Sequence, residues 1–338
     1  MVMLRIFAAL VFCAATLSAQ TTVIRLGTLV PKDSPWYEIL SKMGEEWKQA
    51  SGGKVQLHIY PGGEQGDEPE MVRKVRIKKL QAVALSGAGL SGILADVSAL
   101  QIPLMLDSYE EFDYVRDHIS DRLEKGLAAR KFIVLNWGYA GWVHFFTKKP
   151  ATRPDEIRAM KLCVLQGDAA SFAIYQQNGF HPVGLAATDI FPSLQTGLVD
   201  AIQGPPLFAL TNQWYVGAKN MLDIKFALLV GATVVAKDVW DTIPPDLQKK
   251  LMASAREAGV GLRAEIRKAE ANAIPLMQQF GLNVVHADPA AQAEWQKLAE
   301  SLYPKFKATM VPPDLFDQVV RLKDEYRKAH RTRAAVGR

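Results

Sequence analysis

The sequence predicts an α/β protein built from two lobes. From Thr22 onward, short β-branched runs alternate with longer helical patterns, which is typical of crossover units that build mainly parallel sheets. If the first residues are a cleaved signal peptide, the mature chain has about 320 residues. That is too many for a single hydrophobic core. Two long elements, an apolar strand at 225–236 and a helix at 245–281, are suited to joining the lobes as hinge strand and brace.

The first 19 residues have the pattern of a secretory signal peptide. Arg5 supplies one positive charge, an apolar run follows, and Leu17-Ser18-Ala19 ends it with small residues. The apolar run spans about 12 residues, whereas a membrane helix needs about 20. We therefore expect cleavage before Gln20 and a soluble periplasmic protein.

The elements expected in the first lobe each have a local signal. Ser34 is an N-cap and Pro35 opens a helix whose apolar residues recur every three or four positions. Ser108 and Glu111 form a capping box before another amphipathic helix. We expect strands at 22–29, 54–60, 82–85 and 132–136, and helices at 34–51, 68–79 and 108–127.

The second lobe is expected to begin near Trp142. Asp168 and Thr188 are N-caps, and Gly197 ends the helix that follows Thr188. We expect strands at 142–146, 161–164, 198–202, 225–236 and 283–286, and a bracing helix of the order of 50 Å over 245–281 with Pro275 as a kink site. A further helix restarts at Asp288-Pro289, and a terminal helix covers 314–330. The first lobe is assigned residues 20–140 and 230–269, and the second 141–229 and 270–338.

Charge and cysteine content exclude several classes of protein. The net charge is +5, but 40 basic residues are scattered among 35 acidic ones, so no nucleic-acid partner is expected. The basic run 327–333 is interpreted as a solvated terminus. Once Cys13 leaves with the signal peptide, Cys163 is alone and no intrachain disulfide can form.

No catalytic or metal-binding motif is recognisable. There is no phosphate-binding glycine loop, no nucleophile elbow and no histidine pair at metal spacing. Cys163 with His181 could be read as a thiol and its base, but a lone cysteine in a strand is more often a small buried hydrophobe. We expect a binding protein without cofactor, metal or catalytic residues.

Aromatic residues gather at the ends of the predicted strands, where α/β proteins bind ligands. Core packing explains any one of them equally well, so the argument rests on their recurrence. The candidate ligand-binding residues are Trp36, Ser86, Trp137, Trp142, Cys163, Gln166, Gly204, Phe208 and Trp214.

Several segments resemble the extracytoplasmic solute receptors of tripartite ATP-independent periplasmic (TRAP) transporters, the DctP-like family. The likeness covers nearly the whole mature chain. It is carried by Tyr60-Pro61-Gly62-Gly63-Glu64-Gln65-Gly66-Asp67-Glu68, Ile102-Pro103, Lys149-Pro150, Pro154-Asp155-Glu156-Ile157, Met160-Lys161-Leu162 and, most specifically, Leu194-Gln195-Thr196-Gly197-Leu198-Val199-Asp200-Ala201. The resemblance implies a periplasmic-binding-protein fold, closure over a small organic solute, and delivery to TRAP membrane subunits. We expect a monomer.

The resemblance also implies a carboxylate solute held by an arginine, yet that arginine would fall at Cys163. A second basic position would fall at Val143, an asparagine at Gly204 and an aromatic residue at Ala187. A bidentate arginine cannot be replaced by a thiol. Either the solute is neutral, weakly polar or aromatic, or another cation such as Lys32 or His144 holds it.

Two other functions remain open at this point. The loss of the arginine fits a receptor-derived module that senses or scaffolds without transport. An enzyme that uses Cys163 is the third hypothesis, and the reactivity of its thiol distinguishes it.

Overall fold

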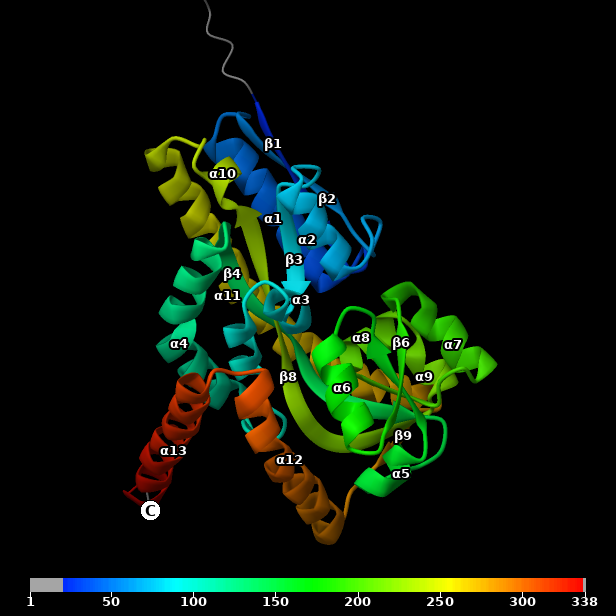
Figure 1. Cartoon of the computed structure of the whole chain (residues 1–338). Coiled ribbons are helices and arrows are strands. Elements are labelled where there is room, and N and C mark those ends of the chain that lie inside the picture. Colours follow the sequence, from blue (N-terminus) through cyan, green and yellow to red (C-terminus); the bar gives the residue numbers. More distant parts are fainter. Residues whose placement is uncertain (1–20, 337–338) are drawn as a thin grey trace, which may run out of the picture.

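The computed structural model describes residues 21–336, with side chains to residue 330, and its centre is one mixed sheet (Figure 1). Within that range the strand order is β2-β1-β3-β8-β4-β7-β5-β6, and β9 pairs with β8. The strands are β1 (Thr22–Thr28), β2 (Val55–Tyr60), β3 (Ala82–Ser86), β4 (Phe132–Thr147), β5 (Lys161–Leu165), β6 (His181–Leu185), β7 (Ala201–Gly204), β8 (Asn220–Ala236) and β9 (Asn283–Val285).

Helices cover the sheet in both lobes. They are α1 (Pro35–Ala50), α2 (Glu68–Arg76), α3 (Gly87–Ser91), η1 (Ala95–Leu100), α4 (Tyr109–Ala129), α5 (Pro154–Arg158), α6 (Ala169–Gln177), η2 (Ala187–Asp189), α7 (Ile190–Thr196), α8 (Pro206–Thr211), α9 (Trp214–Gly217), α10 (Lys237–Trp240), α11 (Pro245–Gln279), α12 (Pro289–Thr309) and α13 (Pro313–Val336). Ser34, Ser108, Asp168 and Asp288 accept the N-terminal backbone bonds expected of caps. None of the described helices is long and apolar enough to cross a membrane.

Two antiparallel strands, β4 and β8, run through both lobes and join them (Figure 1). At one end β8 pairs with β3 of the first lobe, and at the other end β4 pairs with β7 of the second. The two separate strands expected at 132–136 and 142–146 are therefore one strand, because β-bulges carry its pairing with β8 past Gly138 and Gly141. The α/β two-lobed architecture is confirmed.

The helix α11 braces the lobes as expected. Near its start, Leu251 and Ala255 are buried with residues of α1 and β1 in the first lobe. Near its end, Met277 is buried in the core of the second lobe. Pro275 lies inside the helix, whose 35 residues therefore contact both lobes.

The end of the chain departs from the expected division into lobes. Residues 270–338 were assigned to the second lobe, but α13 packs against α4 and η1 of the first (Figure 1). The reason is an apolar face of α13 that includes Leu315 and Val319, both buried in the core cluster that contains Leu123. Arg327 lies in this helix and pairs with the buried Glu111, so the basic run is not simply a solvated terminus.

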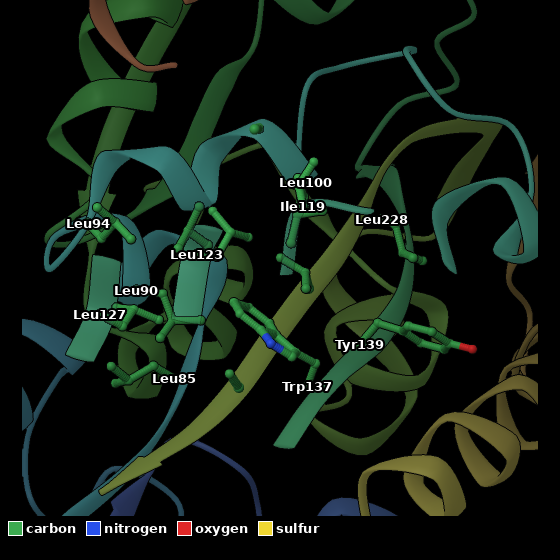
Figure 2. Close-up of a cluster of buried hydrophobic side chains, with 14 of the residues drawn as sticks. Leu85, Leu90, Leu94, Leu100, Ile119, Leu123, Leu127, Trp137, Tyr139 and Leu228 are labelled. Carbon is green, nitrogen blue, oxygen red and sulfur yellow. The ribbon is translucent and has the colours of Figure 1, made fainter. Parts of the chain in front are cut away.

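The main core lies between α3, η1, α4 and the long strands (Figure 2). Leucines of α3 and α4 surround the Trp137 side chain, as Figure 2 shows. The Trp137 indole also donates to Glu124 Oε1 at 3.0 Å. Trp137 is therefore a core residue.

Candidate solute-binding cleft

A cleft of about 640 Å³ separates the lobes. It is lined by the carboxyl ends of β1 and β3 in the first lobe and of β5 and β7 in the second. Ligands of open α/β sheets bind at this edge. Because these strand ends meet at the same edge of the sheet, their last residues all line the cleft, namely Thr28, Ser86, Leu165 and Gly204.

An aromatic stack forms one wall of the cleft and crosses from lobe to lobe. Trp36 of α1 stacks on Phe208 of α8, with ring centroids 4.7 Å apart and planes at 19°. Phe208 in turn stacks on Trp214 at 6.4 Å. Gly204 makes room for this wall, because a Cβ there would lie 2.6 Å from the Trp214 ring. Trp214 thus occupies the space that a side chain larger than that of glycine would need at position 204.

The polar part of the first lobe is centred on Glu68. Its carboxylate accepts from the Ser86 amide at 2.5 Å and from the Ser86 hydroxyl at 2.7 Å. Burial raises the pKa of Glu68, and these hydrogen bonds and that to the Gly89 amide partly offset the effect. Ser86, predicted as a loop residue, is the N-cap of α3.

A second carboxylate, Asp168, faces the same cleft from the second lobe. It caps α6 through the Ser171 amide at 3.0 Å. In the described part of the chain, no lysine, arginine or histidine lines the cleft. Lys32 is not in the lining, and buried His144 bonds the Leu222 carbonyl at 3.1 Å instead. Burial lowers the pKa of His144, so its imidazole stays neutral near pH 7.

Sequence reasoning missed a polar pair on the cleft wall. The Tyr175 hydroxyl donates to Gln203 Oε1 at 2.7 Å, and the Gln203 Nε2 is buried without a partner in the described structure. Burial raises the pKa of Tyr175, so it is a neutral donor. The signal was available, because Gln203 belongs to the strand that ends at the predicted Gly204 site.

Cys163 lines the cleft but is a poor nucleophile. Only 4% of the residue is exposed, and burial raises its pKa to about 12. Its neighbour on β6 is Val183, while His181 pairs with Lys161 at the start of the strand. Among the described residues, no group of three or more metal-ligating side chains is assembled.

The predicted site residues divide into two sets. Trp36, Ser86, Cys163, Gly204, Phe208 and Trp214 line the cleft. Trp137 and Trp142 are absent from its lining, and Gln166 lines a side cavity of about 170 Å³ next to it. Their placement in the cleft is therefore not supported by the geometry. Trp142 packs on Tyr109, at 5.7 Å between centroids, under the Lys225 ammonium.

A protein-family model identifies the family to which the chain with this cleft belongs. Residues 26–309 match the family described as bacterial extracellular solute-binding protein, family 7, known as DctP. The chain belongs to this family. The match covers most of the chain and both lobes, and the expectation of a TRAP-type extracytoplasmic solute receptor is confirmed. Members of this family bind solutes in the periplasm, so the protein is a periplasmic solute receptor.

Named relatives and solved structures agree with the family. The C4-dicarboxylate-binding periplasmic protein DctP of Rhodobacter capsulatus is 24% identical over 83% of this chain and 85% of its own length. The sialic acid-binding periplasmic protein SiaP of Vibrio cholerae is 19% identical over 89% and 92%. A TRAP periplasmic solute-binding protein of Ralstonia eutropha, solved with bound (S)-2-acetolactate, superposes with a TM-score of 0.84 at 21% identity over 90% and 99%. These likenesses support the fold of this DctP-family receptor.

Proposed function

We propose that this DctP-family receptor closes over an uncharged or weakly polar organic solute with an aromatic or apolar face, and delivers it to TRAP membrane subunits. The observation that carries the proposal is the charge of the cleft. In the described structure its lining holds the carboxyl groups of Glu68 and Asp168 and no basic side chain.

A carboxylate solute would be poorly stabilised there. Transfer of a carboxylate into a closed cleft without a partner costs several kcal/mol. At Cys163 a buried thiol stands where the family resemblance implies an arginine, and Val143, at the second basic position, also lines the cleft. The neutral donors of Gln203 and Ser171 and the aromatic wall suit a polar but uncharged molecule better.

The remaining parts of the proposal follow from the same assignment. The receptor binds its solute without chemical conversion, since Cys163 is buried with a raised pKa. We propose that it acts as a monomer. Cleavage before Gln20 also remains a proposal, because the predicted signal peptide lies outside the described residues.

The test is a matched panel of three phenylalkyl probes that differ in charge. Calorimetry is performed with 2-phenylethanol, 2-phenylethylamine and 3-phenylpropionate, and native mass spectrometry identifies solute retained through purification. We expect the neutral alcohol to bind more tightly than 3-phenylpropionate. A retained carboxylate solute, or tighter binding of 3-phenylpropionate, would contradict the proposal.

A further inference from the structure

The strand β4 is irregular where it passes between the lobes. Tyr139 pairs with Val230 of β8, and the next pair is Trp142 with Leu228. Three steps along β4 therefore oppose two along β8, which is a β-bulge. Gly141 within the bulge has φ of +115°, a conformation that L side chains rarely adopt. The bulge sets the backbone direction at which β4 leaves the first lobe.

A buried carboxylate from the bracing helix occupies this bulge. Glu270 of α11 is 9% exposed, and its Oε1 accepts from the Trp142 backbone amide at 2.7 Å. Its Oε2 accepts from the Tyr109 hydroxyl of α4. A Cβ on Gly141 would lie 2.7 Å from Oε1, so the carboxylate packs directly on the glycine. Glu270 thus joins α11, β4 and α4 at the crossing point.

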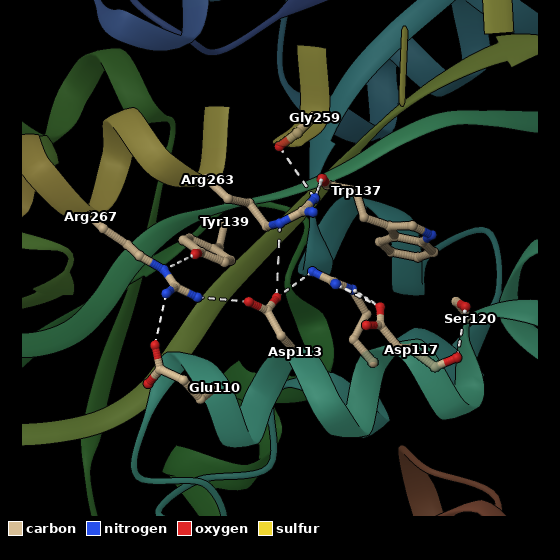
Figure 3. A network of polar contacts seen from close by, with 10 residues as sticks. Glu110, Asp113, Asp117, Ser120, Trp137, Tyr139, Gly259, Arg263 and Arg267 are labelled. Carbon is tan, nitrogen blue, oxygen red and sulfur yellow. Dashed lines mark hydrogen bonds and ion pairs between the residues drawn. The ribbon is translucent and has the colours of Figure 1, made fainter. Parts of the chain in front are cut away.

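The charged groups around Glu270 are engaged with other partners. Arg267, nearly one turn earlier, lies 4.6 Å above the Tyr109 ring and bonds Tyr139, Glu110 and Asp113 (Figure 3). Lys225 of β8 lies over the Trp142 ring at 5.5 Å. Among the described residues no ion pair reaches Glu270. The other titratable group on this part of β4, His144, bonds Leu222.

We propose that Glu270 is the positioning residue of the hinge, and that closure of the lobes over the solute takes up a proton at its carboxyl group. Opening changes the path of β4 at this bulge, which separates the Trp142 amide from Glu270 and admits water to Oε1. Closing restores the buried geometry described above. This inference rests on the proposed function in one respect, namely that the lobes close.

The electrostatic environment gives the direction of the effect. Burial raises the pKa of Glu270 from 4.5 to about 7 in the described conformation, in which the Trp36 and Phe208 rings stack between the lobes. If opening returns the carboxyl group to its ordinary pKa, the closed form binds the proton more tightly and is favoured at lower pH. The ratio of closed to open protein then rises about tenfold from pH 8 to pH 6.

The experiment measures lobe separation without any solute. Gln49→Cys on α1 and Gln176→Cys on α6 place spin labels on exposed helical positions of the two lobes. The native Cys163 stays unlabelled because it is buried and its pKa is raised. Pulsed electron paramagnetic resonance gives the distance distribution at pH 6, 7 and 8. We expect the short-distance fraction to grow as the pH falls.

Two substitutions assign the effect. Glu270→Gln imitates the protonated group and should give a short-distance fraction that no longer changes with pH. Glu265→Gln removes one charge from an exposed position of the same helix and should leave the pH response unchanged. If open and closed forms were present in the same proportion at every pH, proton uptake at Glu270 would be overturned. The role of Glu270 in positioning the hinge would not be affected by that result. A single fixed distance at every pH would overturn the proposed pH-dependent equilibrium between open and closed forms, and the same measurement with 2-phenylethanol then tests closure over a solute.

Discussion

The solute cleft and the hinge lie on the same long strands but differ in where charge is placed. The described lining of the cleft has no basic side chain. At the hinge, Arg263 and Arg267 of α11 meet Asp113 of α4, and Arg267 also bonds Tyr139 of β4 (Figure 3). Among the described residues, arginine side chains therefore bind across the hinge, whereas the cleft lining offers the carboxyl groups of Glu68 and Asp168, aromatic rings and neutral polar groups.

This difference predicts two kinds of mutational effect. Breaking a partly buried ion pair leaves a charge without its partner, and a side chain at the positive-φ position of Gly141 would be strained, so changes at the hinge should lower the free energy of unfolding by several kcal/mol. The cleft is an open space whose lining carries no basic side chain in the described structure. Changes there should alter affinity by smaller factors and leave stability largely intact.

The largest effect is expected from Gly141→Ala. The added methyl group combines a positive φ with a 2.7 Å approach to Glu270 Oε1. We expect the free energy of unfolding to fall by about 2–4 kcal/mol, measured by urea denaturation. Gly281→Ala is the control, because Gly281 has a φ of +93° but no atom within 4 Å of the added Cβ. An equal loss in both variants would show that the hinge contact adds nothing.

The next effect is the pH dependence of stability that Glu270 causes. Its pKa is raised to about 7 in the folded protein, so its contribution is fully favourable below pH 4.5 and is lost as the pH rises through 7. The loss approaches about 3 kcal/mol between these limits. Denaturation of the wild type and of Glu270→Gln at a series of pH values should show the difference widening over this range. A constant difference would mean that Glu270 does not titrate there.

Local signals in the sequence predicted most of the fold. Caps at Ser34, Ser108 and Asp168, and the glycine at 197, fix helix ends through contacts within a few residues. The sequence did not predict that α13 docks on the first lobe. The apolar face of α13 could pack on either lobe, and the turn before the helix decides which one it reaches. Periodicity does not contain that information.

The candidate site was predicted in part, for a related reason. Strand ends predict Ser86, Cys163 and Gly204 near one edge of the sheet, and all three line the cleft because parallel strands bring their carboxyl ends together. Trp137 and Trp142 are absent from the lining because bulges in β4 change which side chains face the cleft. Glu270 could not be found from sequence, as its importance comes from a contact with a backbone amide 128 positions away.

A smaller effect should follow from Cys163→Arg in the cleft. A guanidinium there supplies charge-assisted hydrogen bonds worth roughly 1.5–3 kcal/mol, or about ten- to a hundredfold in affinity for a carboxylate. Calorimetry with 3-phenylpropionate and succinate should detect this gain, and Cys163→Gln, which adds length without charge, should not produce it. Tight carboxylate binding by the unaltered protein would show that a group other than residue 163 binds the carboxylate.

The smallest effect concerns the aromatic stack that joins the lobes. Phe208→Leu keeps an apolar side chain but removes the ring that stacks on Trp36 at 4.7 Å. Such a stack contributes about 0.5–1.5 kcal/mol beyond its buried area, so affinity for 2-phenylethanol should fall by roughly two- to tenfold. Phe191→Leu is the control, because Phe191 belongs to the second lobe and lies outside the cleft lining.

A double-mutant cycle with Trp36→Leu separates the stack from the loss of solute contact. If the rings act as a pair across the lobes, the two substitutions together should weaken binding less than the product of their separate effects, by about the energy of the stack. Multiplicative effects would mean that each ring contacts the solute independently. Closure would then depend on the hinge alone, where Arg263 and Arg267 meet Asp113.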